Sequence, residues 1–102
     1  QHLHASCIVS PQQLIEHWPV TSVAALNPEQ LAPLLSLAPR IVLLGSARAG
    51  ERPGAALRRA FESQGIALEC MELGAACRTY NVLAHEGRSV AAGLVLEGAK
   101  SA

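Results

Sequence analysis

The sequence contains no aspartate, one lysine and few aromatic residues, and these shortages exclude whole classes of function. Only 3% of the residues are aromatic, which leaves too few rings to stack against nucleic-acid bases. Eight basic side chains balance eight acidic ones, so the basic excess of a nucleic-acid-binding domain is missing. No apolar run approaches the roughly 20 residues that span a bilayer. We therefore expect neither a nucleic acid nor a membrane among the partners.

Cysteine is also scarce, and its spacing excludes the usual disulfide and zinc motifs. The cysteines are odd in number and form no Cys-x-x-Cys pair, so they build neither a disulfide framework nor a four-cysteine zinc site. The positions concerned are Cys7, Cys70 and Cys77. Such unpaired thiols favour a reducing cytoplasm as the location.

Two histidines near the N-terminus have a spacing that a metal site can use. His2 and His4 fall on one side of an expected strand, and His17 follows, but the sequence assures no carboxylate or further ligand. We expect these side chains to face solvent and to bind no metal. The chain lacks both the phosphate-loop and the dinucleotide fingerprints, so we expect no cofactor either.

Apolar side chains, in contrast, are abundant. Half of the 102 residues are hydrophobic, which is far above the level of a disordered chain. That length suits one core and not two. The chain starts at Gln1 rather than at a methionine. We expect a single domain over residues 1–102 whose N-terminal strand is incomplete or missing.

The first half of the chain predicts two strands and a short helix. Residues 3–9 are typical of a strand that ends at Ser10-Pro11, and residues 13–18 are its expected partner. The helix begins at Asn27-Pro28, because Asn27 can cap free amides and Gln30 stands three residues on. Pro33 interrupts this helix, so we expect it to be short or kinked.

The second half alternates strands and helices. Residues 41–44 are continuously apolar and end at Gly45, as in a buried strand. A helix then begins at Pro53 and stops at Gly65, with a buried stripe of Leu57, Ala60, Phe61 and Gln64 or its neighbours. The remaining elements are a strand over 66–71, a helix over 74–86 that stops at Gly87, and a strand over 88–96 covered on both faces.

This order predicts an α/β fold. We expect a three-layer single domain with a mixed, partly parallel central sheet that is flanked by helices. The two opening strands should add a small N-terminal antiparallel β layer.

The sequence also resembles a known family. The run Ala-Ala-Cys-Arg-Thr-Tyr-Asn-Val-Leu at 75–83 is followed by Glu86-Gly87-Arg88 and Val90-Ala91-Ala92. It closely resembles a family of domains of unknown function that includes mitochondrial complex I assembly factor three and an adipogenesis-associated protein. The upstream matches are Ser10-Pro11, Trp18, Pro39, Leu43-Leu44-Gly45 and Pro53. The resemblance covers nearly the whole chain and implies a layered α/β fold with no established enzyme activity.

The chain departs from that family at two positions. Gly45-Ser46-Ala47 stands where members usually carry Gly-Thr-Gly. Met71-Glu72-Leu73 stands where many carry Met-Asp-Thr. Whatever those family residues do is therefore not carried over to this chain.

A candidate site lies where the predicted strands end and a helix begins. Strand carboxyl ends and helix N-termini form a crevice that suits anions, and Arg78 in the first helical turn can supply a guanidinium. The candidate residues are Gly45, Ser46, Glu72, Gly74, Arg78 and Asn81. One interpretation is a pocket for a small anionic or carboxylate-bearing ligand. The other is that the glycines form turns and Arg78 pairs with Glu72, Glu86 or a carbonyl.

Other reactive side chains do not combine into a catalytic site. Cys77 and His85 stand about 12 Å apart along one helix, so we expect Cys77 to be a structural cysteine. Glu72 and Glu86 flank opposite ends of that helix, about 20 Å apart, which is too far for shared proton transfer. Trp18 and Tyr80 are expected to pack in the core or in an interface.

We therefore favour a protein that is not an enzyme. The leading hypothesis is a protein-interaction or assembly-factor-like module, with another protein or a second copy as its partner. The alternative is a small anionic-ligand-binding protein, or an enzyme, that uses the crevice at the strand ends.

Overall fold

The strands and helices alternate in the order that the sequence predicts. The structure, a computed structural model, describes residues 6–20, 22–23, 26–47 and 52–96. Its elements are β1 (Cys7–Ser10), β2 (Gln13–Ile15), a 3-10 turn (Pro28–Leu31), α1 (Ala32–Ser36), β3 (Ile41–Ser46), α2 (Ala55–Ser63), β4 (Ala67–Glu72), α3 (Leu73–His85) and β5 (Val90–Val95).

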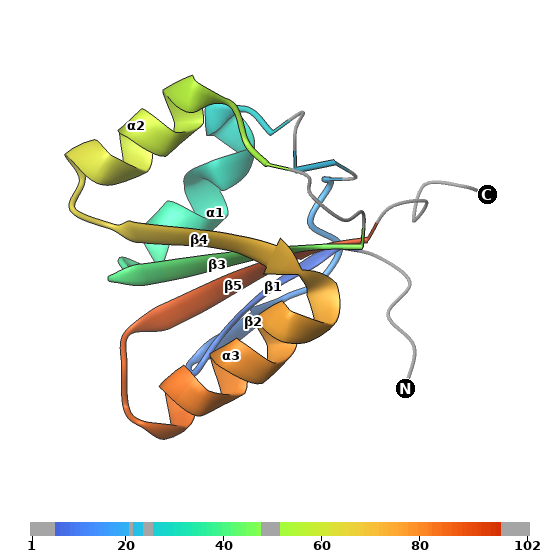
Figure 1. The fold of residues 1–102 in the computed structure, drawn as a ribbon, viewed down its shortest axis with the longest axis vertical. Coiled ribbons are helices and arrows are strands. Elements are labelled where there is room, and N and C mark those ends of the chain that lie inside the picture. Colours follow the sequence, from blue (N-terminus) through green and yellow to red (C-terminus); the bar gives the residue numbers. More distant parts are fainter. Residues whose placement is uncertain (1–5, 21, 24–25, 48–51, 97–102) are drawn as a thin grey trace.

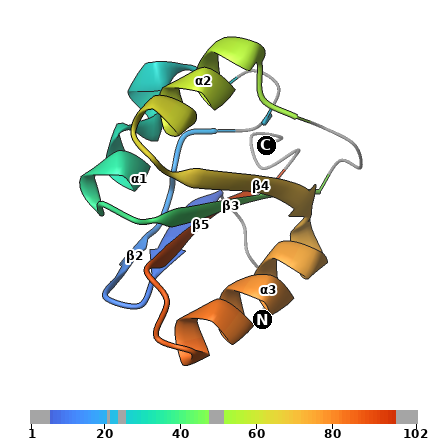
Figure 2. The same cartoon turned by 60° about the vertical axis from the view of Figure 1, so that its left-hand side comes forward.

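The strands form one mixed sheet in the order β2-β1-β5-β3-β4. β3 runs parallel to both β4 and β5, whereas β1 is antiparallel to β5 and β2. Helices α1 and α2 cover one face, and α3 covers the other (Figures 1 and 2). The predicted three-layer α/β architecture with a partly parallel sheet is confirmed.

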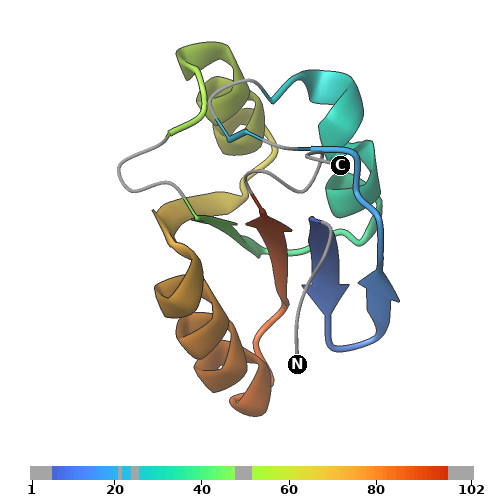
Figure 3. The same ribbon diagram turned by 90° about the vertical axis from the view of Figure 1, so that its right-hand side faces the viewer.

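The N-terminal hairpin differs from the prediction in one respect. It is not a separate β layer, because residues 7–9 of β1 pair directly with residues 92–94 of β5. Figure 3 shows the blue hairpin beside the red strand β5. Backbone hydrogen bonding therefore continues the same sheet through β1 to β2. The sequence predicts the strands and their antiparallel turn, but no local pattern identifies β5 as the neighbour.

The central strand β5 supports both helical layers. All six of its residues are buried, which confirms the prediction that both faces are covered. Ala91 and Val95 belong to the core under α1 and α2, and Val90, Ala92 and Leu94 belong to the core under α3. Because side chains alternate between the two faces of a strand, β5 contributes residues to both hydrophobic cores.

The capping residues begin the first helical segment as predicted. The Gln30 amide donates to Asn27 Oδ1 at 2.9 Å, and the Asn27 amide donates to Gln30 Oε1 at 3.1 Å. A 3-10 turn comes first, and α1 has only five residues. Pro33 lies in the first turn of α1, where its missing N–H has no intrahelical partner to lose. The expected short helix is confirmed.

The second helix is shorter than predicted at its start. α2 begins at Ala55 instead of Pro53, and its buried side chains are Leu57 and Phe61. Ala60 is half-buried and Gln64 is exposed, so the buried stripe is narrower than expected. Gly65 adopts a φ of 72°, in the left-handed region that glycine tolerates, and ends the segment as predicted.

Trp18 packs directly on the backbone of β5. Its side chain is 3% exposed, and its indole N–H donates to the Gln30 carbonyl at 2.8 Å. A Cβ atom on Gly93 would lie 2.8 Å from Trp18 Cζ3, so the ring and the strand fit only because residue 93 has no side chain. This places Trp18 in the core with its polar atom bonded, as expected from the sequence.

Gly93→Ala should therefore destabilise the fold by about 1–3 kcal/mol through overpacking. Urea unfolding monitored by circular dichroism measures the loss. In a double-mutant cycle, the same change should cost less in a Trp18→Phe background, because the smaller ring leaves room for the methyl group. Equal costs in the two backgrounds would show that the close contact with Trp18 is not the cause.

Candidate functional site

The strand ends at which the sequence predicts a crevice are those of β3 and β4. Ser46 and Glu72 are partners in the parallel register, and α3 begins at the next residue, Leu73. The Glu72 carboxylate accepts hydrogen bonds from the amides of Gly74 at 3.0 Å and Ala75 at 3.1 Å. The N-terminus of α3 is therefore capped by a carboxylate of the chain itself.

This capping changes the acidity of Glu72. The hydrogen bonds from the backbone amides of Gly74 and Ala75 lower the pKa of its carboxyl group, and the Arg78 guanidinium acts in the same direction. The ionised carboxylate also interacts favourably with the positive end of the helix dipole. In one interpretation of the sequence, these helix amides stabilise a ligand anion. In the structure they stabilise the Glu72 carboxylate instead.

Gly45 and Ser46, which are consecutive residues of β3, face opposite sides of the sheet. A Cβ atom on Gly45 would stand 2.7 Å from the Cβ of Ala76, so the glycine permits α3 to approach β3 closely. Ser46 is only 3% exposed and alternates with Val42 and Leu44, which belong to the core under α1 and α2. Gly45 therefore forms the packed floor of the predicted site, and Ser46 lies on the other face of the sheet.

Arg78 and Asn81 supply the exposed polar groups of the site. With Gly74 they follow the spacing of one helix face, and both side chains are exposed. Arg78 Nη1 lies 3.4 Å from the point where a Cβ on Gly74 would stand. The structure thus brings Glu72, Gly74 and Arg78 together. Asn81 stands about 10 Å from Gly74 along the helix axis.

The other reactive side chains are separated as the sequence predicts. Cys77 and His85 both lie on α3, about 12 Å apart along its axis. Cys77 and Tyr80 pack against the core under α3, and partial burial raises the pKa of Tyr80. His2 and His4 lie outside the described residues. Within the described part of the chain, no three His, Cys, Asp or Glu side chains converge to hold a metal ion.

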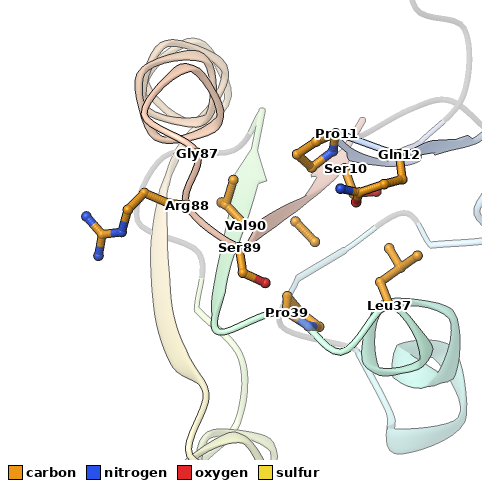
Figure 4. A pocket seen from close by; sticks show the side chains of 10 residues that line it. Ser10, Pro11, Gln12, Leu37, Pro39, Gly87, Arg88, Ser89 and Val90 are labelled. Atoms are coloured by element: carbon orange, nitrogen blue, oxygen red, sulfur yellow. The ribbon is translucent and has the colours of Figure 1, made fainter.

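A hollow at the opposite end of the sheet was not predicted. It has a volume of about 180 Å³ and lies among the β1–β2 turn, the α1–β3 connection and the α3–β5 connection (Figure 4). Its lining residues are Ser10, Pro11, Gln12, Leu37, Pro39, Gly87, Arg88, Ser89, Val90 and Ala91. Proline and glycine turn signals mark all three connections, but only the tertiary structure brings them together.

The hollow offers hydrogen bonds without acid–base chemistry. Its polar side chains are hydroxyls, an amide and a guanidinium, and the Arg88 side chain points away from the interior in Figure 4. Its lining contains no carboxylate, imidazole or thiol. The volume is well below the roughly 300–1,000 Å³ of usual ligand pockets, so the hollow suits a small group and not a cofactor.

The described surface includes two exposed apolar side chains and the two end strands of the sheet. Leu14 on β2 is 55% exposed and Val82 on α3 is 56% exposed. β2 and β4 are the end strands of the sheet formed by the described residues. Among the helices described, none combines the length and the apolar character needed to cross a membrane.

The chain is similar to a family and to several solved structures. The family model described as "Protein of unknown function (DUF498/DUF598)" matches residues 1–95. An NMR structure from Xanthomonas campestris superposes with a TM-score of 0.88 at 43% identity, covering 96% of this chain and 74% of that one. An NMR structure from Bordetella pertussis, described as an Mth938-like domain, gives a TM-score of 0.75 at 26% identity, with 89% and 73% covered.

Curated relatives carry a name that refers to assembly. The Bos taurus protein named NADH dehydrogenase [ubiquinone] 1 alpha subcomplex assembly factor 3 is 35% identical over 91 residues. The alignment covers 87% of this chain but 49% of the relative, so the chain spans about half the length of that protein.

The cap at Glu72 predicts a specific acid sensitivity. The folded-state pKa of Glu72 lies below its ordinary value of 4.5, so its stabilisation is complete above that pH and is lost as the pH falls through the lowered pKa. Glu72→Gln should therefore lower the melting temperature at neutral pH and flatten the decline of stability on acidification. Thermal unfolding over a series of pH values measures both effects.

Glu86→Gln is the matched control, because Glu86 follows the other end of α3. It removes one carboxylate without touching the amides of Gly74 and Ala75. Identical pH profiles for the two variants would contradict a special role of the Glu72 cap.

Proposed function

The chain belongs to the DUF498/DUF598 family, and on this basis we propose that it is a non-enzymatic protein-interaction module of the assembly-factor type. The observation that carries the proposal is its 35% identity, over 87% of its length, to a protein named as an assembly factor. The activity of that whole protein is not assigned to this chain, which spans about half of it.

Two exposed apolar side chains are available to a partner protein. Leu14 and Val82 are left in solvent, and contact with another protein would bury apolar area at each of them. At the predicted crevice, Glu72 already satisfies two amides of α3. We place the module in a reducing cytoplasm, where the free thiols of Cys7, Cys70 and Cys77 would persist.

The proposal predicts a stable complex that depends on the exposed apolar residues. The tagged natural full-length protein, isolated from its own cells after mild crosslinking, should copurify with the same partner in repeated preparations. A Leu14→Ser, Val82→Ser double variant should lose most of that partner and keep its melting temperature, because both side chains are exposed.

The matched control is a Gln13→Ser, His85→Ser double variant, which changes exposed polar residues on the same two elements. It should retain the partner. Repeated recovery of the protein alone, or equal losses in the two double variants, would count against the interaction role. Light scattering after size exclusion identifies a second copy if that is the partner.

A second candidate function is binding of a small anion at the crevice, by a ligand-binding protein or by an enzyme. The observation that favours it is the exposed Arg78 guanidinium beside the α3 N-terminus. An anion there would compete with Glu72 for the amides of Gly74 and Ala75.

This candidate predicts that phosphate and dicarboxylates raise the melting temperature of the natural protein. Arg78→Ala and Asn81→Ala should abolish the shift, and Glu72→Gln should enlarge it by freeing the amides of α3 from a charged competitor. No shift with the unaltered protein across a broad set of anionic metabolites would remove this candidate.

A further inference from the structure

In the sheet formed by the described residues, the outer edge of β4 presents backbone groups without a strand partner, in a defined pattern. Within the described sheet, β4 is the last strand and pairs with β3 alone. The Ala67 amide donates to the Arg40 carbonyl at 3.0 Å, so residue 67 directs its backbone toward β3. Because direction alternates along a strand, Glu69 and Met71 also bond inward. The N–H and C=O groups of Leu68 and Cys70 therefore point to the outer edge.

Among the described residues, this edge has few of the features that usually prevent strand addition. β4 is six residues long and contains no proline, lysine or glycine, and its only charged side chains are Glu69 and Glu72, whereas the opposite edge strand β2 has only three residues. Helix α2 lies beside one face of β4 and α3 begins at its end (Figure 2). Within the described part of the chain, an incoming strand would thus find the donors and acceptors of Leu68 and Cys70.

Opposite charges lie on the two faces of this edge. Leu68 and Cys70 face the core under α2, on the side where the positive charges of Arg52 and Arg58 act on Cys70. Met71 faces the core under α3, so by alternation Glu69 lies on that second face, and its side chain is exposed. A complementary strand needs an acidic side chain on the α2 face and a basic one opposite Glu69.

We propose that the outer edge of β4 binds an extended segment of a partner protein, which adds a strand to the sheet with a basic residue opposite Glu69 and an acidic residue toward Arg52 and Arg58. The inference rests on the proposed interaction function and adds a contact surface to the exposed Leu14 and Val82 side chains. A second copy of β4 is a poor occupant, because its two charged residues, Glu69 and Glu72, are both acidic. Strand addition takes affinity from main-chain bonds and specificity from alternate side chains.

Amide exchange tests the open edge directly. In the natural full-length protein, the amides of Leu68 and Cys70 should exchange at least an order of magnitude faster than those of Glu69 and Met71. Equal protection of all four amides would overturn the inference, because the edge would then be occupied already.

A library of random dodecapeptides displayed on phage supplies the probe for binding. Enriched peptides should alternate β-branched with charged residues, and a synthetic copy should protect the Leu68 and Cys70 amides. Cys70→Pro should raise the Kd of the peptide about tenfold, because the outward N–H is lost and the proline ring obstructs pairing. The ladder to β3 survives this change, since the N–H of residue 70 does not bond inward. Cys70→Ser keeps that donor and should bind like the unaltered protein.

Charge reversal provides an independent readout that does not depend on how well the proline variant folds. Glu69 is exposed, so Glu69→Lys should leave the fold intact. When the library is selected for binding to this variant, the enriched peptides should carry an acidic residue in place of the basic one. When it is selected for binding to Arg58→Glu, they should carry a basic residue in place of the acidic one. Unchanged enrichment with both variants, or no enrichment with the unaltered protein, would overturn the proposed charge pattern.

The outcomes separate this inference from the interaction function. A cellular complex that leaves the Leu68 and Cys70 amides unprotected overturns the β4 site and leaves the interaction role standing. A concentration-dependent dimer that protects these amides overturns the choice of a foreign strand. A third outcome is that peptides bind β4 but the protein is repeatedly recovered alone from cells. This result supports the β4 site and counts against the interaction role.

Discussion

The structure depends on the burial of β5 on both faces. Its small residues allow close approach from each side, as at Gly93, where the Trp18 ring would be 2.8 Å from an added Cβ. β5 also joins the two parts of the sheet, since β1 pairs with it antiparallel and β3 pairs with it parallel. Both hydrophobic cores and the N-terminal hairpin therefore rely on one strand that has no exposed residue.

A second close contact shapes the predicted site. Gly45 lets α3 lie near β3. Because α3 begins at the residue that follows β4, Glu72 is its N-cap and reaches the free amides of Gly74 and Ala75. The same geometry that would attract an anion is thus satisfied by a carboxylate of the chain, and Arg78 lies beside it. Any ligand at this point must displace an interaction that already stabilises the fold.

The proposed interaction with another protein would use features that the described part of the fold leaves exposed. Exposed Leu14 and Val82 offer apolar area, and the outer edge of β4 offers main-chain hydrogen bonds. The hollow between Ser10, Pro39 and Ser89 adds a small polar depression at the other end of the sheet. With a formal net charge of zero, the chain has no dominant electrostatic target, so shape and local charge pattern must determine which partner fits.

Local sequence determined the elements, their order and the start of the first helix, because turn residues, capping residues and apolar periodicity act over a few neighbouring positions. It predicted correctly that Pro33 shortens α1 and that both faces of β5 are covered. Tertiary structure alone decided that β1 pairs with β5, that Gly45 is floor and not surface, and that three turns enclose a hollow. These features join residues far apart in the chain, where contact depends on packing that no local pattern specifies.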